Sequence, residues 1–273
     1  MVRASGEEWY YCKTLCLDYS MVDLYHKIYG EGEPVIIIHG LFGMSDNWAS
    51  FAKKLSEDRM VIIVDVRDHG RSPHTADFSY ALCAEDIAAF MEKNWIYEAD
   101  VIGHSMGGKV SMQLAYDNPE LVKNLVVVDI GPGGYKGGHE QIIQALLSID
   151  ISTVSSRKEV QEKLMEDIGE LGTVLFLMKN LQRKKEGGFR WKMNLHLLKE
   201  KYPEIIGPLD ISDIEHNTLF IKGENSNYIE EGQKALIGEI FAQAEIKEIK
   251  DASHWVHADQ PDALFKNILT FLK

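Results

Sequence analysis

Short runs of apolar residues alternate along the chain with stretches in which apolar residues recur every three or four positions. Short runs rich in valine and isoleucine predict strands that are covered on both faces. The candidate strands are Val35–Ile38, Val61–Asp65, Asp100–Ile102, Leu125–Asp129, Leu219–Ile221 and Ala244–Ile249. A weaker alternation over Met21–Tyr29 predicts an antiparallel edge strand. The pattern therefore predicts an α/β fold with a mostly parallel central sheet flanked by helices.

Two further stretches have the helical period. The apolar residues of Tyr80–Asn94 fall on one face, among them Ile87, Phe90 and Met91, and this predicts an amphipathic helix. Near the end of the chain, Pro261 stands where proline is favoured, at a first helical position. The apolar residues that follow it predict a C-terminal helix.

The alternation of strand-like runs with helical stretches is interrupted from Pro132 to Ile206. This stretch has no strand-like run, and its apolar residues form helical stripes. The stripes consist of Ile142, Ile143, Leu146 and Leu147; of Leu171, Val174, Leu175, Met178 and Leu181; and of Trp191, Leu195 and Leu198. A glycine-rich segment precedes the stretch, and Gly207-Pro208 follows it. We therefore expect a helical cap over residues 132–206, inserted into an α/β core of residues 20–131 and 207–273.

The chain has 273 residues and a net charge of -13 at pH 7. So acidic a chain argues against nucleic-acid binding, which needs a basic footprint, and against tight adsorption to anionic membranes. No apolar run approaches the roughly 20 residues of a transmembrane segment. The expected partner is a small molecule, and the oligomeric state is left open.

The three cysteines, Cys12, Cys16 and Cys83, form an odd and sparse set. Such a set favours free thiols in a reducing compartment. The N-terminus carries Glu7 and Glu8 and has neither the apolar core of a secretory signal nor the arginine-rich character of a transit peptide. We expect a cytoplasmic or mitochondrial-matrix protein that is not secreted.

The segment Gly103-His104-Ser105-Met106-Gly107 fits the pattern G-x-S-x-G. It directly follows a candidate strand and precedes a helical pattern. A serine on such a sharp strand–turn–helix is held above the sheet at the positive end of the helix, and the flanking glycines avoid a clash. We therefore predict that Ser105 is a nucleophile.

A loop after the first core strand offers backbone amides to a developing oxyanion. It reads His39-Gly40-Leu41-Phe42-Gly43. Acyl transfer uses amide donors aimed at this charge. We expect one donor from Met106, next to the nucleophile, and the other from Leu41, with Phe42 as the alternative. His39 itself is expected to bond the backbone for structural reasons.

A general base must take the proton of the serine. The chain has 10 histidines, so position has to select among them. His254 follows the last candidate strand, precedes the C-terminal helix and comes after Ser105 in the chain order of this kind of triad. His257 is the rival.

The acid that orients the histidine is missing from its usual place. The loop after Leu219–Ile221 contains no aspartate, and Ser226 stands in that region. Asp129 ends the neighbouring candidate strand, and strand ends on one edge of a parallel sheet face the same crevice. We predict Asp129 as the acid of the triad, with support from Ser226; Glu224 and Asp251 are the alternatives.

Several segments together resemble a known family. They are H-G-L-F-G at 39–43, S-D-N-W at 45–48, V-D-V-R-D-H-G-R-S-P-H at 64–74, G-H-S-M-G-G-K at 103–109, V-V-V-D-I at 126–130 and S-H-W-V-H at 253–257. In this order they resemble the YbfF-type esterases and their eukaryotic relatives, the α/β-hydrolase domain-containing protein 11 family. The likeness runs from Tyr25 to the C-terminus, and the cap matches only in position and helical character.

The resemblance implies an α/β-hydrolase fold and the hydrolysis of esters or thioesters, with lipid-like or acyl-CoA substrates. It also implies Ser105 as nucleophile, His254 as base and Asp129 as acid, with Ser226 nearby. One departure is Asp68, where relatives usually carry Asn or Gly in the turn after the second core strand; we interpret that turn as structural. Eukaryotic members of the family are associated with mitochondria.

The predicted mechanism is two-step acyl transfer through an acyl-enzyme. It needs no metal or cofactor, and the histidines show no metal-ligand spacing. Two alternatives stay open. A carbon–carbon bond hydrolase keeps the serine and the histidine, and a ligand-binding receptor or scaffold uses the same pocket without turnover.

The cap is expected to determine substrate choice, because it covers the crevice above the nucleophile. Trp48 and Trp191 are candidate substrate-binding residues. Arg183, Lys184 and Lys185 stand out in an acidic chain. We hypothesise that they attract an anionic leaving group such as coenzyme A; the plainer interpretation is a solvated helix end.

Overall fold

The structure is a computed structural model that describes residues 21–273. Glu7, Glu8, Cys12 and Cys16 lie outside the described residues, as does residue 20 at the start of the predicted core. Cys83 lies within them and is a free, buried thiol.

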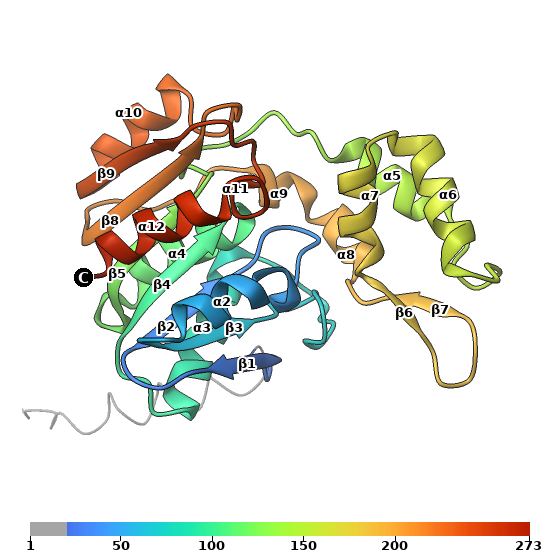
Figure 1. Ribbon diagram of the computed structural model, residues 1–273, viewed down its shortest axis with the longest axis horizontal. Coiled ribbons are helices and arrows are strands. Elements are labelled where there is room, and N and C mark those ends of the chain that lie inside the picture. Colours follow the sequence, from blue (N-terminus) through green and yellow to red (C-terminus); the bar gives the residue numbers. More distant parts are fainter. Residues whose placement is uncertain (1–20) are drawn as a thin grey trace, which may run out of the picture.

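A seven-stranded sheet forms the centre of the molecule, in the order β1-β3-β2-β4-β5-β8-β9 (Figure 1). Its strands are β1 (His26–Tyr29), β2 (Pro34–Ile38), β3 (Met60–Val64), β4 (Ala99–His104), β5 (Val122–Val128), β8 (Ile214–Gly223) and β9 (Phe241–Ile249). β1 pairs antiparallel with β3, and the other pairs are parallel. The structure confirms the predicted α/β fold with a mostly parallel sheet.

Helices cover both faces of the sheet because successive side chains of a strand point to opposite faces. The core helices are α2 (Ala49–Leu55), α3 (Tyr80–Lys93), α4 (Met106–Asp117), α10 (Glu231–Ile240), α11 (Val256–Asp259) and α12 (Pro261–Phe271), with short 3-10 helices at Ser45–Trp48 and Pro119–Leu121. Ile36 and Ile38 of β2 pack in one apolar layer with α3 and α4, whereas Val35 and Ile37 pack in the other with α2 and α12.

The six predicted core strands are present, and the predicted edge strand is β1. The structure differs from the prediction mainly at strand ends. β8 begins at Ile214 rather than Leu219, because polar residues occupy its exposed first half and hide the apolar pattern. Asp65 and Asp129, predicted as the last residues of their strands, fall just beyond β3 and β5.

The region predicted as a cap contains five helices and one β-hairpin. They are α5 (Glu140–Ser148), α6 (Arg157–Ile168), α7 (Leu171–Met178), α8 (Leu195–Glu200) and α9 (Tyr202–Ile206), with β6 (Leu181–Arg183) pairing antiparallel with β7 (Phe189–Trp191). These helices stand beside the sheet and the hairpin projects from them (Figure 1). We propose that residues 132–206 act as one cap unit.

The hairpin corrects two sequence-based predictions. Leu181 and Trp191 were expected on helices but lie on paired strands, and Arg183 to Lys185 lie at the end of β6 and in the turn rather than at a helix end. Strands of three residues are too short for a period to be visible. Gly187 and Gly188, with φ of 100° and 74°, are the turn signal in the sequence.

A buried lysine ties both ends of the cap to the core. Lys109 of α4 donates from Nζ to the carbonyl oxygen of Gly133 at 2.9 Å and to that of Gly207. Gly133 lies where the chain leaves the core, and Gly207 lies where it returns. One side chain thus fixes the two connections next to the helix that follows Ser105.

The turn after β3 makes a second contact with the cap. Asp68 Oδ1 accepts hydrogen bonds from the backbone N–H of Thr75 at 2.8 Å and from Asn194 Nδ2 at 2.9 Å. The backbone N–H of Asn194 also donates to the carbonyl oxygen of Asp68 at 2.8 Å. The aspartate at this position, unusual in the family resemblance, therefore anchors the residues before α8.

Arg67 holds the same turn against α3. Its Nε and Nη2 donate to the two carboxylate oxygens of Asp86 at 2.6 and 2.7 Å, and both side chains are buried. Two parallel charge-assisted hydrogen bonds fix the orientation of the guanidinium as well as its position.

We predict that Asp86→Ala lowers the free energy of unfolding by about 3–5 kcal/mol, because it leaves a buried guanidinium without its carboxylate. Urea denaturation measures the change. The matched control is Glu85→Ala, an exposed neighbour on the same helix, which should change the free energy by less than about 0.5 kcal/mol. Equal stability of the two variants would contradict the assignment.

Candidate active site

Ser105 lies in the turn between β4 and α4, with φ of 52° and ψ of -122°. The neighbouring glycines are required by space. A Cβ on Gly103 would lie 2.2 Å from Ser111 Oγ, and one on Gly107 would lie 2.3 Å from the carbonyl oxygen of Ile38. This crowding explains the G-x-S-x-G pattern and holds the serine in a backbone conformation that non-glycine residues rarely adopt.

His254 comes from the loop between β9 and α11 and lies beside the serine. Its Nε2 is 3.0 Å from Ser105 Oγ, and its Nδ1 is 2.7 Å from Asp129 Oδ2. Because an ionised carboxylate only accepts, Nδ1 carries the proton and Nε2 is free to accept one from the serine. The Tyr228 ring stacks on the imidazole with centroids 3.9 Å apart, so the ring plane is fixed from one side as well as along its edge.

Asp129 follows β5 directly, is completely buried and has a φ of 54°. Its Oδ1 accepts from the backbone N–H of Gly223 at 2.9 Å, and its Oδ2 accepts from Ser226 Oγ and from His254 Nδ1. Hydrogen bonds to both oxygens offset the cost of burying the carboxylate. The structure thus brings Asp129, Ser226 and His254 together.

The two alternative acids, Glu224 and Asp251, bond to each other rather than to His254. Glu224 Oε2 accepts a hydrogen bond from the backbone N–H of Asp251 at 2.8 Å, and both residues are exposed. Neither forms a hydrogen bond with His254 within residues 21–273.

The candidate oxyanion donors surround Ser105. The backbone N–H groups of Leu41, Phe42 and Met106 donate to no acceptor in the described part of the chain. The carbonyl oxygen of Phe42 accepts from Asn180 Nδ2 of the cap at 2.7 Å, so the cap fixes the peptide that follows Phe42. All three predicted amides are therefore at the site, and the choice between Leu41 and Phe42 stays open.

The other nearby histidines have structural roles. His39 Nε2 accepts from the backbone N–H of Val66 at 3.0 Å, and its Nδ1 donates to the Gly40 carbonyl at 2.8 Å. Burial lowers the pKa of His39 and keeps the ring neutral. His104 Nε2 donates to the carbonyl oxygen of His254 at 2.9 Å, which helps to position the loop.

His257, the rival base, stacks on Trp48 with ring centroids 4.7 Å apart. Burial lowers its pKa to about 4. It forms no hydrogen bond with Ser105 or Asp129 within the range that the structure describes, so the geometry favours His254.

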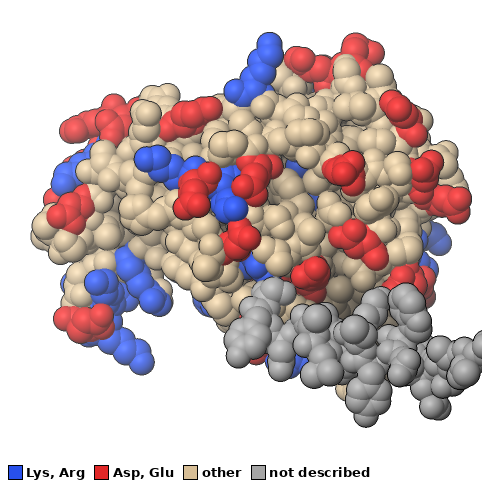
Figure 2. Space-filling model, turned by 180° about the vertical axis from the view of Figure 1, so that it is seen from behind, with Lys and Arg blue, Asp and Glu red and all other residues tan. Residues whose placement is uncertain are grey.

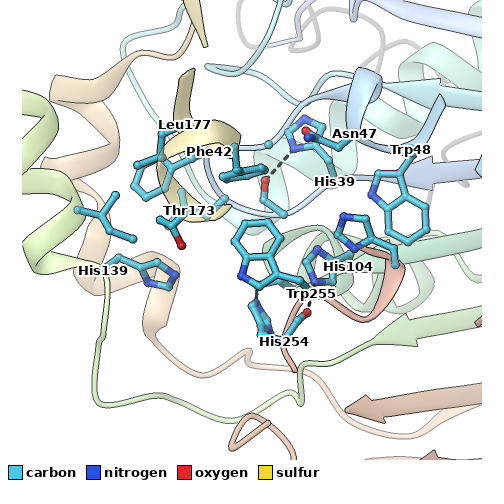
Figure 3. Close-up of a pocket in the computed structure, with 17 residues that line it drawn as sticks. His39, Phe42, Asn47, Trp48, His104, His139, Thr173, Leu177, His254 and Trp255 are labelled. Atoms are coloured by element: carbon cyan, nitrogen blue, oxygen red, sulfur yellow. Dashed lines mark hydrogen bonds between the residues drawn. The ribbon is translucent and has the colours of Figure 1, made fainter. Parts of the chain in front are cut away.

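Two cavities meet at Ser105. The larger has about 500 Å³ of empty volume and is lined from the core by the loop after β2, by Trp48 and by His254, Trp255 and His257. The cap closes it with His139, Thr173, Phe176 and Leu177, among others; Figure 3 shows His139, Thr173 and Leu177 across the cavity from His104 and Trp48. Trp48 thus lines this cavity, whereas Trp191 on β7 lines neither of the two.

The smaller cavity has about 350 Å³ of empty volume and also has Ser105 in its lining. Its polar lining residues include Lys109, His139 and Tyr228. None of these three residues was a predicted site residue. The sequence shows Lys109 after the G-x-S-x-G segment and His139 after the glycine-rich segment, but no sequence signal places them at one cavity.

Within residues 21–273, no group of three or more histidine, cysteine, aspartate or glutamate side chains has a metal-binding arrangement. In the same range, no helix has the length and apolar character to cross a membrane.

Comparison with known proteins identifies the family. A family model of the α/β hydrolase fold matches residues 33–147. The chain is 35% identical to the sn-1-specific diacylglycerol lipase ABHD11 of Danio rerio, over 93% of this chain and 84% of the lipase. It is 34% identical to the esterase YbfF of Escherichia coli, over 89% of this chain and 94% of the esterase.

A solved structure agrees with these relatives. An esterase of a marine microorganism superposes with a TM-score of 0.89 at 40% sequence identity, over 92% of this chain and 99% of the other. The chain therefore belongs to the α/β-hydrolase family and, within it, to the carboxylic ester hydrolases.

Proposed function

We propose that the protein is a serine esterase that cleaves acyl esters through a Ser105–His254–Asp129 triad and an acyl-enzyme. The observation that carries the proposal is the continuous hydrogen-bonded chain from Ser105 Oγ through the His254 ring to Asp129, with distances of 3.0 and 2.7 Å. Nucleophile, base and acid in this order have the geometry and the roles of a hydrolytic triad.

In the first step, Ser105 Oγ attacks the ester carbonyl while His254 Nε2 takes the hydroxyl proton. The carbonyl oxygen becomes an oxyanion that accepts hydrogen bonds from the Met106 amide and from the amide of Leu41 or Phe42. When the tetrahedral intermediate collapses, the alcohol leaves with the proton from His254 Nε2, and the acyl group stays on Ser105.

In the second step, a water molecule takes the place of the alcohol. His254 Nε2 accepts a proton from the water as its oxygen attacks the acyl carbonyl. The intermediate collapses, Ser105 Oγ recovers the proton, and the carboxylic acid is released. Asp129 stabilises the imidazolium in both steps without itself taking up the proton.

Lipid-type esters are the proposed substrates, since one relative is named a diacylglycerol lipase and the larger cavity is lined mainly by apolar and aromatic side chains.

Thioesters are the second candidate, and a basic hairpin favours them. Arg183, Lys185 and Arg190 are exposed on β6, its turn and β7. Basic side chains gather on this projecting part at the lower left of Figure 2, while acidic side chains are spread over the rest of the visible face. The hairpin follows α7, which lines the larger cavity, so an anionic leaving group emerging there would meet positive charge.

We predict that Ser105→Ala lowers kcat for p-nitrophenyl esters by about 10³–10⁶-fold, because the acyl-enzyme cannot form. Turnover is measured along a series of increasing acyl length. Ser50→Ala, an exposed serine on α2, is the matched control and should retain the parent rate. Saturable turnover by the Ser105 variant would contradict the mechanism.

We predict that Asp129→Asn lowers kcat by about 10⁴-fold while leaving the fold intact, because an amide cannot hold His254 in the required tautomer. Ser226→Ala should cost less, since two other donors still hold the carboxylate. Glu224→Gln is the control for the alternative acid and should retain activity. A large loss in Glu224→Gln together with an active Asp129→Asn would reverse the assignment.

For the thioester candidate, we predict that the triple variant Arg183→Glu, Lys184→Glu, Lys185→Glu lowers the ratio of kcat/KM for acyl-CoA to that for a neutral ester by about tenfold. The loss should shrink in high salt, because exposed charges are screened. An unchanged ratio would exclude this role of the hairpin.

A further inference from the structure

The position of His254 assigns one half of the substrate to each cavity. His254 must protonate the leaving group, and it lines the larger cavity but not the smaller one. The alcohol therefore belongs in the larger cavity. Met106, an oxyanion donor in the proposed mechanism, lines only the smaller cavity, and Leu41 lines both. The acyl group accordingly extends from Ser105 into the smaller cavity.

The smaller cavity contains a buried cation that lacks a carboxylate. Lys109 is 1% exposed, and no acidic side chain of residues 21–273 pairs with it. Its Nζ bonds two backbone carbonyls, of Gly133 and Gly207. An ammonium group has three donors, so one of them is not used by these two hydrogen bonds. Nζ also lies 5.1 Å from the centre of the Tyr135 ring.

Burial without a counter-charge lowers the pKa of Lys109 to about 7. A negatively charged ligand beside Nζ would stabilise the ammonium form of this lysine, because opposite charges attract strongly in a place of low polarity. The overall charge of -13 does not attract anions at long range, so recognition of an anion here has to be local.

Two more polar groups of the same cavity are without a partner. The Tyr228 hydroxyl forms no hydrogen bond with any described residue. His139 uses its backbone N–H and its Nδ1 on the Tyr202 hydroxyl, at 3.0 and 3.1 Å. The hydroxyl accepts from the backbone N–H and donates its own hydrogen to Nδ1 in the tautomer that carries the imidazole proton on Nε2. In this tautomer, His139 Nε2 is an unused donor.

We infer that the smaller cavity is a subsite for a carboxylate carried on the acyl group, bound by Lys109 Nζ with the Tyr228 hydroxyl and His139 Nε2 as further donors. The substrate class is the half-esters of dicarboxylic acids, in which one carboxyl group is esterified and the other is free. This inference rests on the proposed function, because it places the esterified carbonyl at Ser105 and the free carboxylate in the cavity beside it.

The hydroxyl groups of the two other tyrosines in this cavity do not compete for the ligand. Tyr80 Oη donates to the carbonyl oxygen of Ile205 at 2.7 Å, and Tyr135 Oη donates to that of Tyr228 at 2.9 Å. Their rings lie beside the lysine. The cavity therefore offers a few directed donors within apolar walls, as specific small-molecule sites do.

The test compares p-nitrophenyl half-esters of glutarate, adipate and suberate with neutral p-nitrophenyl alkanoates of the same chain length. The quantity is the ratio of kcat/KM for the anionic ester to that for its neutral partner. We expect Lys109→Met to lower this ratio about tenfold or more, since a charged hydrogen bond is lost, and to lower it mainly through KM. Lys123→Met, an exposed lysine on β5, makes the same change in net charge and should leave the ratio within twofold.

Tyr228→Phe keeps the ring that stacks on His254 and removes only the hydroxyl. It should lower the same ratio about threefold or more. This variant provides the test if Lys109→Met loosens the cap connections and does not fold. A fall of less than threefold in Lys109→Met and none in Tyr228→Phe would overturn the inference.

Failure of the subsite and failure of the proposed function give different results. If neutral esters are cleaved through Ser105 and the ratios do not change, only the subsite is wrong. If neither ester is cleaved, the proposed function is wrong, and calorimetric binding of the glutarate half-ester to Ser105→Ala decides the subsite. About tenfold weaker binding to Ser105→Ala, Lys109→Met supports it, and equal binding overturns it.

Discussion

Asp129 joins three segments that meet at the carboxyl edge of the sheet, through its backbone N–H and its carboxylate. Its backbone N–H donates to Ile221 of β8 at 2.7 Å, its Oδ1 accepts from Gly223, and its Oδ2 accepts from Ser226 and His254. Because the residue is completely buried, an unmet hydrogen bond here would be costly. The loops after β8 and β9 therefore take their positions from one residue at the end of β5, and the imidazole beside Ser105 depends on both.

The cap is fixed to the same region of the core by a few buried polar contacts. Lys109 bonds both of its connections, Asn180 bonds the peptide after Phe42, and Asn194 bonds Asp68. These contacts place cap side chains over both cavities, so residues of the core and of the cap together line the space around Ser105. In the proposed function, substrate choice depends on which groups the cap brings to Ser105, whereas the chemistry depends on core residues.

The sequence predicted the parts of the site that local geometry determines. Gly103 and Gly107 revealed the elbow because no side chain fits there, and Asp129 followed from the rule that parallel strand ends share one crevice. The hairpin of Leu181–Arg183 and Phe189–Trp191 was missed because such short strands show no period. The positions of His139 and Tyr228 at the candidate site were not predicted, because their contacts join segments far apart in the chain.

The most direct test of acyl transfer through Ser105 is to locate the acyl group on the protein. The protein is incubated with a p-nitrophenyl carbamate, which transfers its carbamoyl group to a reactive serine and forms a carbamoyl-serine that hydrolyses slowly. Release of p-nitrophenol measures the reaction, and peptide mass spectrometry then locates the carbamoyl group. We predict one carbamoyl group per chain on the peptide that contains Ser105, with loss of esterase activity in proportion to the labelled fraction. Full esterase inhibition with Ser105 unmodified, or with the adduct on another residue, would contradict it.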